Sequence, residues 1–153
     1  MSRTRSAAVA GLFYPADPAQ LHQEIQSMLA MSETTGSAPK ALIVPHAGYI
    51  YSGPVAASAF AQLQGISQQI ERVILLGPCH RVPLRGLATT SADYFETPLG
   101  RIKIERDALN QIITLSQVEE FDLTHQQEHS LEVQLPFLPE VRDEFCLGPL
   151  GVG

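Results

Sequence analysis

The chain has 153 residues, of which 44% are hydrophobic and 17% are charged, and its formal net charge is -6 with neutral histidines. This length and composition fit one domain with an apolar core, and they exclude two full domains and wholesale disorder. The negative charge argues against nucleic-acid binding, and no apolar run approaches the roughly 20 residues that cross a membrane. Because we find no export signal and only two cysteines, we expect a cytoplasmic protein with reduced thiols.

The first half of the chain has the pattern of an α/β domain. Asp17, followed by proline, is typical of a helix start, and the apolar spacing predicts a helix over 18–31. The unbroken apolar runs 41–44 and 73–76 predict strands that are buried on both faces. The alanine-rich segment 55–63 between them predicts a helix, so strand, helix and strand are expected to form a βαβ unit.

In the second half, short apolar segments alternate with turn-forming residues. The pattern predicts strands over 86–90 and 101–104, a turn-rich segment over 93–100, helices over 107–115 and 125–135, and a strand from Phe145 onward. No helix follows this last strand, so we expect a domain that is cut short at its C-terminus.

Two histidines occupy matching places after the two predicted buried strands. His46 lies two residues beyond the first strand and His80 four residues beyond the second. The carboxyl ends of parallel strands form the ligand-binding edge of an α/β sheet, so both imidazoles are expected at one rim. Imidazole at such a rim suits zinc, iron or copper, and it also suits proton transfer. The alternative is that each is a turn histidine bonded to a nearby carbonyl.

Residues beside these histidines are candidates for lining the same rim. Cys79 precedes His80 and could be a thiolate nucleophile, a metal ligand or an inert buried cysteine. Tyr49 and Tyr51 alternate after His46, and either could line the rim or pack in the core. No phosphate-binding glycine motif is present, so no nucleotide cofactor is expected.

A third histidine group matches the letters H-x-x-E-H of inverted zinc peptidases. His125 and His129 would hold zinc and Glu128 would act as general base. This interpretation requires both histidines on one helix face and an acidic ligand on a second helix, and no such helix follows. The alternatives are a solvated histidine at a helix start for His125 and a packed histidine for His129.

Several motifs together resemble the Memo family, whose bacterial members are called AmmeMemoRadiSam system protein B. The segments that carry the resemblance are 10–15 (AGLFYP), 45–53 (PHAGYIYSG), 76–80 (LGPCH), 95–100 (FETPLG) and 128–136 (EHSLEVQLP). Each motif alone is weak, but their order and spacing are specific, and the likeness runs from about Ala8 to the end.

The resemblance implies a fold similar to class III extradiol dioxygenases, an α/β fold in which a central sheet has helices on both faces as three layers. It implies that His46 and His80 are metal ligands and that His129 is a third ligand or an acid/base group. Tyr49, Cys79 and Glu128 are then expected to line the same pocket. In the family a cysteine near the C-terminus completes the ligand set, and neither cysteine of this chain occupies that position. Residues 1–153 would therefore form a single, incomplete Memo-like domain.

The first functional hypothesis is thus a metal-binding domain with non-haem Fe(II) or copper, or with zinc, and redox or dioxygenase-like chemistry on a small molecule. The alternatives are a non-catalytic binding module for a peptide or an anionic ligand, and a zinc hydrolase built on His125, Glu128 and His129. Whether the chain is an enzyme stays open at this point. Family association implies radical-SAM and AMMECR-type proteins as partners, and an uncovered sheet edge predicts a homodimer.

Overall fold

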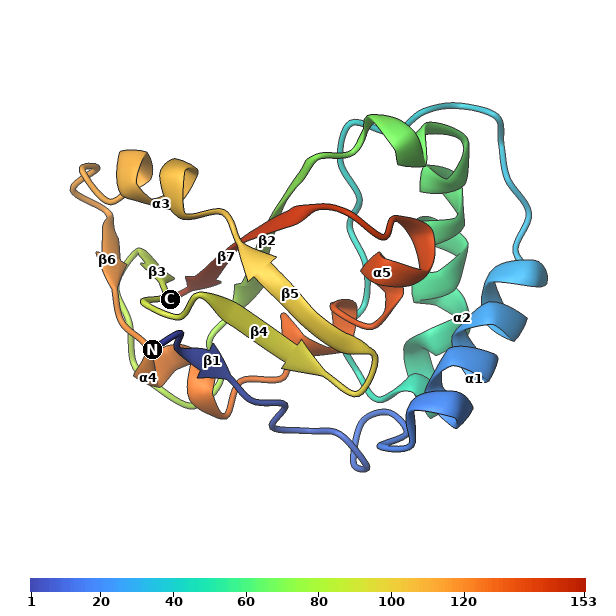
Figure 1. Ribbon diagram of the computed structural model, residues 1–153, viewed down its shortest axis with the longest axis horizontal. Helices are drawn as coiled ribbons and strands as arrows, with labels where there is room; N and C mark the ends of the chain where they lie inside the picture. Colours follow the sequence, from blue (N-terminus) through green and yellow to red (C-terminus); the bar gives the residue numbers. More distant parts are fainter.

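The computed structural model describes residues 1–153 and shows a mixed α/β fold whose sheet is curled into a half-barrel (Figure 1). The elements in chain order are β1 (Thr4–Arg5), α1 (Pro18–Ala30), α2 (Tyr49–Phe60), the 3-10 helix η1 (Ala61–Gln69), β2 (Arg72–Pro78), β3 (Leu87–Thr89), β4 (Tyr94–Thr97), β5 (Gly100–Ile104), α3 (Arg106–Ile112), β6 (Val118–Glu120), α4 (Leu123–Gln126), the 3-10 helix η2 (Glu132–Gln134), α5 (Phe137–Val141) and β7 (Cys146–Val152). None of the helices combines the length and the apolar character that crossing a lipid bilayer requires.

The last strand, β7, organises the sheet. On one edge β2 pairs with it in parallel along its whole length, from Arg72 opposite Cys146 to Pro78 opposite Val152. On the other edge β5 pairs with the beginning of β7 and β3 pairs with its end. The strand order is β1-β4-β5-β7-β3-β6, with β2 beside β7. Because two strands share one edge of β7, the sheet bends around this strand.

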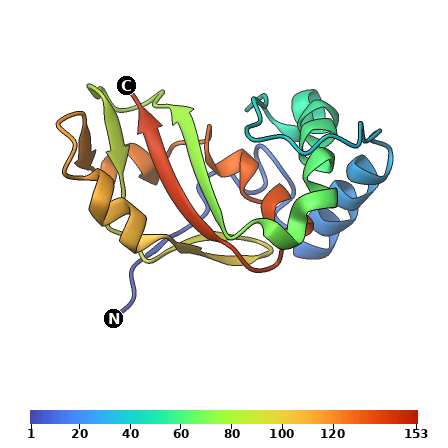
Figure 2. The ribbon, with the colours of Figure 1, turned by 90° about the horizontal axis from the view of Figure 1, so that it is seen from above.

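Helices α1 and α2 lie together on one side of the molecule, and α3 lies at the opposite end of the sheet (Figures 1 and 2). The apolar positions of α1, including Leu21 and Ile25, are completely buried. Phe60 of α2 stacks on Phe137 of α5 with ring centroids 4.9 Å apart. These contacts form the main hydrophobic core. The core holds α2 in place and thereby the segment just before α2, which carries His46.

Six of the predicted elements are confirmed, and two of them are β3, predicted over 86–90, and α3, predicted over 107–115. Helix α1 matches the predicted 18–31, and the Asp17 side chain accepts a hydrogen bond of 2.8 Å from the Gln20 backbone N–H as its N-cap. Strands β2, β5 and β7 cover the apolar runs that predicted them. Both cysteines are free, as expected.

The prediction of a buried strand at 41–44 is wrong. These residues are not part of the sheet, and none of residues 41–46 makes a backbone–backbone hydrogen bond. Ile43 is fully exposed, and in β2 the side chains of Ile74 and Leu76 are 50% and 56% exposed. The predicted βαβ unit therefore does not form, because an apolar run becomes a strand only where another strand pairs with it.

The predicted helix 125–135 is also wrong. Helix α4 ends at Gln126, and only the short η2 follows, so His129 lies in irregular backbone between them. The physical reason is local: the Glu128 carboxylate accepts the backbone N–H groups of His129 and Ser130, both at 2.9 Å. Those N–H groups are then not available to continue a helical ladder.

Two boundaries differ from the predictions. Segment 93–100 contains strand β4, which forms a hairpin with β5, and only Pro98 and Leu99 lie between the paired ends. Helix α2 begins at Tyr49 rather than near Val55, with Gly48 as its N-cap and Pro54 inside it. The prolines do not interrupt either element, because a proline near a helix start or at a hairpin end is tolerated.

Candidate metal centre

The side chains of three histidines converge from separate parts of the chain. His46 precedes α2, His80 follows β2, and His129 lies between α4 and η2. One ring nitrogen from each lies within 4.8 Å of the others. The ring centroids are 5.3 Å apart for His46 and His80, and 4.6 Å apart for His80 and His129. This geometry is compact enough for a single ion to contact all three imidazoles.

The backbone around His46 is held by contacts from outside its own segment. Gln134 donates a hydrogen bond of 2.9 Å from Nε2 to the carbonyl of Pro45. On the other side, the Tyr49 N–H donates to the carbonyl of Phe13 at 2.8 Å. The Phe13 ring in turn packs on His129 with centroids 4.6 Å apart. The residues before α1 thus help to position two of the three histidines.

Glu128 is the buried carboxylate that orients His80. It accepts hydrogen bonds from the His80 backbone N–H at 2.6 Å and from His80 Nδ1 at 2.9 Å. Burial acts to raise the pKa of Glu128, but the hydrogen bonds from His80 and Ser130 outweigh it and lower that pKa to about 2. An ionised carboxylate is acceptor-only, so His80 Nδ1 carries a proton and Nε2 is left to bind a metal.

His129 is held in the neutral form that binds metals. Burial lowers the pKa of His129, the Glu128 carboxylate opposes this shift, and the neighbouring His80, His46 and Arg81 side chains lower the pKa further. Its ring packs against Phe13 and against His80, and it is nearly parallel to the His80 ring, at 17°. A neutral, sterically fixed imidazole is a ready ligand.

An open cleft of about 660 Å³ lies beside two of the histidines. It is lined by Leu12, Phe13, Pro45, His46, Ala47, Gly48, Tyr51 and His129. No Lys, Arg, Asp or Glu contributes to this lining. A small molecule with an apolar part could therefore approach the imidazoles without meeting a formal charge.

Tyr49 takes the core position that the sequence left open as an alternative to lining the pocket, and the Cys79 sulfur also faces away from the three histidines. Tyr49 is buried in the core, its hydroxyl donates to the Val133 carbonyl at 2.7 Å, and burial raises its pKa; Tyr51 lines the cleft instead. The Cys79 sulfur faces β7, where a Cβ added to Gly151 would meet it at 2.6 Å. Burial, followed by the nearby Glu128 charge, raises the pKa of this thiol, which disfavours a thiolate nucleophile.

His125 does not join the three histidines. It is buried, its Nε2 lies 3.0 Å from the Ala88 carbonyl oxygen, and its ring packs edge-on against Phe95. Because His125 and His129 are not on one helix, the zinc-peptidase pattern lacks the geometry it needs.

A buried carboxylate that the sequence does not reveal as functional, Glu132, braces the site. Glu132 is 1% exposed. It accepts hydrogen bonds from Arg5 Nη1 at 2.5 Å, the Tyr14 hydroxyl at 2.7 Å, and the backbone N–H groups of Ala8 and Val9 at 2.8 and 2.9 Å. Arg5 also donates to the carbonyls of His125 and Glu128, both at 2.9 Å. The N-terminal segment is thus clamped to the residues on either side of His129.

Replacing Gly77 with alanine is expected to disturb the site through packing. A Cβ at Gly77 would lie 2.8 Å from Ser130 Oγ and 2.9 Å from a methyl carbon of Leu131, so the segment after His129 must shift. Overpacking of this kind costs about 1–3 kcal/mol. Thermal unfolding and metal titration should both show a loss for Gly77→Ala. Gly65→Ala, where the added Cβ meets nothing within 4 Å, is the control and should leave both unchanged.

Comparison with known proteins gives a consistent result. A sequence model described as "Memo-like protein" matches residues 5–153. The chain is 38% identical over 151 residues to a MEMO1 family protein of Aquifex aeolicus, covering 98% of this chain and 55% of the relative. It is 34% identical over 154 residues to Protein MEMO1 of Homo sapiens, covering 97% of this chain and 51% of the relative. The chain therefore spans about half the length of the curated relatives it matches, and it belongs to the Memo-like family.

Proposed function

We propose that the chain binds one transition-metal ion through His46, His80 and His129. The observation that carries this proposal is the convergence of three ring nitrogens within 4.8 Å of one another. Imidazole ligands suit Fe(II), copper and zinc, and the first two are the metals that fit redox chemistry.

The residues present fit such an ion. Glu128 already accepts four N–H donors, from His80 twice, His129 and Ser130, so it orients the ligands and does not need to be one. Three protein ligands leave coordination positions open, which is the arrangement of catalytic rather than structural metal sites. The bound metal would supply Lewis-acid or redox chemistry.

The chain itself would contribute three things to that chemistry. Glu128 keeps the proton on Nδ1 of His80, burial keeps His129 neutral, and the uncharged cleft admits a small molecule beside the imidazoles. We extend the proposal to redox chemistry on a small molecule in a domain with an extradiol dioxygenase-like fold. The curled sheet, with His80 directly after β2 and the His46 and His129 rings close to it, supports this extension.

Metal titration tests the proposal. Fe(II), Cu(I) and Zn(II) are titrated anaerobically into the untagged chain, and about one metal ion per chain is expected for the metal that fits. The His46→Ala/His80→Ala variant should lose this binding. His22→Ala is the matched control, because His22 is exposed, pairs with Glu140 and is not one of the three converging histidines. Unchanged stoichiometry in a folded double variant, or no binding by the folded parent chain, would contradict the proposal.

A further inference from the structure

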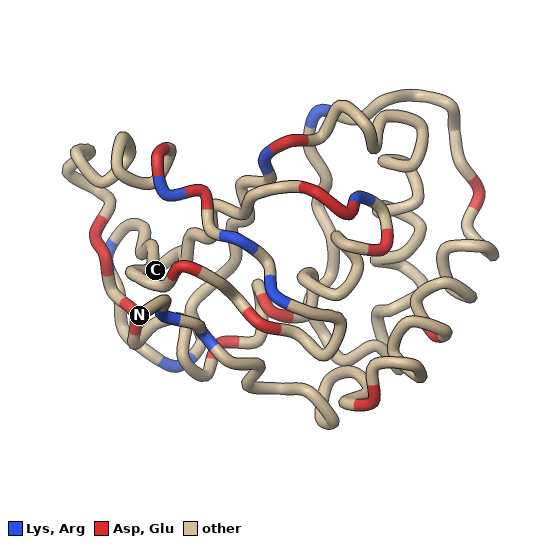
Figure 3. Tube along the Cα trace, viewed as in Figure 1, with Lys and Arg blue, Asp and Glu red and all other residues tan.

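The segment that carries His46 has few contacts that fix its direction. Residues 41–46 belong to no helix or strand and make no backbone–backbone hydrogen bond. The chain has no Lys, Arg, Asp or Glu over 41–70, as Figure 3 shows, so no such charge pairs this segment with its surroundings. Leu42 and Val44 pack against the core, but apolar packing is non-directional. The contact that orients His46 must therefore be of another kind.

Gln134 donates the only hydrogen bond that residues 41–46 make. Its Nε2 lies 2.9 Å from the carbonyl oxygen of Pro45. Because only the amide nitrogen can donate to a carbonyl, the orientation of the Gln134 amide is determined. The Pro45 carbonyl and the His46 N–H belong to one planar peptide unit. The bond therefore fixes the plane from which the His46 side chain departs.

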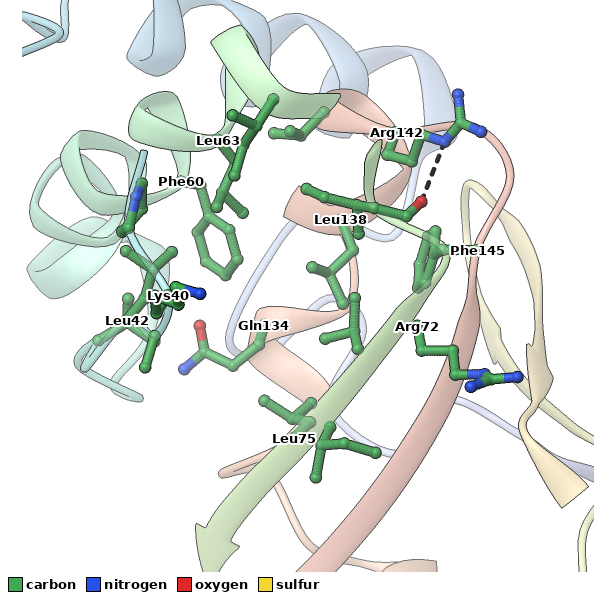
Figure 4. A pocket seen from close by; sticks show the side chains of 18 residues that line it. Lys40, Leu42, Phe60, Leu63, Arg72, Leu75, Gln134, Leu138, Arg142 and Phe145 are labelled. Atoms are coloured by element: carbon green, nitrogen blue, oxygen red, sulfur yellow. Dashed lines mark hydrogen bonds between the residues drawn. The ribbon is translucent and has the colours of Figure 1, made fainter. Parts of the chain in front are cut away.

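The other end of the Gln134 amide has no partner. Gln134 is 3% exposed, and its Oε1 accepts no hydrogen bond. In Figure 4 the side chain lies between Leu42 and Leu75, in apolar surroundings. A buried acceptor without a donor destabilises the folded state, and each such group in a protein needs an explanation. The stability of the fold does not explain an amide at this position, whereas its contact with Pro45 does.

The residue before Gln134 is fixed to the other parts of the site. The Val133 N–H donates to the carbonyl of His129 at 3.0 Å. The Val133 carbonyl accepts a hydrogen bond of 2.7 Å from the hydroxyl of Tyr49, the first residue of α2. The backbone of η2 is thus tied to His129, and the Gln134 side chain extends from this backbone to the peptide that precedes His46.

We propose that Gln134 is a positioning residue of the metal centre, which sets the direction of the His46 imidazole relative to His129 through the Pro45 carbonyl. This inference rests on the proposed metal binding. A metal site needs its ligands held to within about 0.5 Å of the productive geometry. Pro45 is half-buried, so without Gln134 its carbonyl can turn toward water. The His46 ring would then leave the arrangement in which the three ring nitrogens lie within 4.8 Å of one another.

Gln134→Met tests the proposal, because methionine is also unbranched and has three rotatable bonds but cannot donate to the carbonyl. The first measurement uses the metal-free chain, labelled with ¹⁵N for residual dipolar couplings. The coupling of the His46 N–H should change in Gln134→Met, whereas those of the His80 and His129 N–H groups should stay as in the parent. The midpoint of denaturant unfolding should equal or exceed that of the parent, because the unpaired buried oxygen is gone.

The second measurement is a competition titration with Zn(II), a redox-inactive probe. Gln134→Met should bind Zn(II) about tenfold or more weakly than the parent. In the His46→Ala background the same substitution should have no further effect, because the ligand that Gln134 positions is already absent. Gln62→Met is the matched control: the Gln62 amide donates to the carbonyls of Glu33 and Ser58, both at 2.8 Å, away from the histidines. This variant should leave the three dipolar couplings and the Zn(II) affinity unchanged.

The outcomes separate this proposal from the proposed function. An unchanged His46 coupling in Gln134→Met would overturn the positioning role whether or not metal binds. A changed coupling with parental Zn(II) affinity would also overturn it, as would a further loss of affinity in the His46→Ala background, which would indicate a general loosening. Absence of Zn(II), Fe(II) and Cu(I) binding by the folded parent would count against the metal proposal, and the couplings alone would then decide whether Gln134 orients His46.

Discussion

Replacing Glu132 with alanine is expected to lower the free energy of unfolding by about 3–5 kcal/mol, because it leaves a buried arginine charge without its partner. Arg5 would keep its bonds to two carbonyls but lose the carboxylate at 2.5 Å. The Tyr14 hydroxyl and the backbone N–H groups of Ala8 and Val9 would lose their acceptor as well. The N-terminal segment should loosen from the segment that carries His129.

Denaturant unfolding of four proteins measures this effect. The parent, Arg5→Ala, Glu132→Ala and the double variant form a cycle in which the two losses should be far from additive. Glu96→Ala removes one partner of the exposed pair with Arg101, at 3.7 Å, and should change stability by less than about 1 kcal/mol. A Glu132→Ala effect as small as that of Glu96→Ala would refute the clamp.

Replacing Glu128 with glutamine is expected to weaken metal binding about 10–100-fold, which is typical for loss of the partner that orients a histidine ligand. With a pKa of about 2, Glu128 is ionised at neutral pH and accepts from His80 Nδ1. An amide has only one acceptor oxygen, and its NH₂ group cannot accept the His80 donors. The His80 ring should lose its fixed tautomer, while all three imidazoles remain present.

Competition titration compares Glu128→Gln with the parent and with Glu119→Gln, which removes an exposed carboxylate on β6. The Glu119 variant should bind like the parent. Amide-region circular dichroism confirms that each variant is folded before its affinity is interpreted. Equal affinities for all three proteins would show that Glu128 does not orient the ligands.

The sequence predicts the positions of the site histidines better than it predicts the strands around them. The rule that ligands gather at strand ends placed His46 and His80 together, and their rings are 5.3 Å apart. Yet segment 41–44 is not a strand, because pairing depends on a neighbour that a local apolar run cannot reveal.

Other features could not be predicted from the sequence. Some join residues that are far apart in the chain, and others override the apolar spacing from which helices are predicted. Apolar spacing predicts a helix over 125–135, but the Glu128 carboxylate captures the N–H groups on which that helix would depend. Arg5 and Glu132 are 127 residues apart, and nothing in a single sequence connects them. Position in the chain also gave no sign that Phe13 packs on His129.

The central claim is that three histidines share one metal ion, and X-ray absorption of the metal-loaded chain tests it most directly. The parent should show three imidazole ligands, from His46, His80 and His129. His129→Ala should show one imidazole fewer, with the same metal still held by the other two. An unchanged imidazole count in His129→Ala, or a parent spectrum without imidazole ligands, would contradict the account.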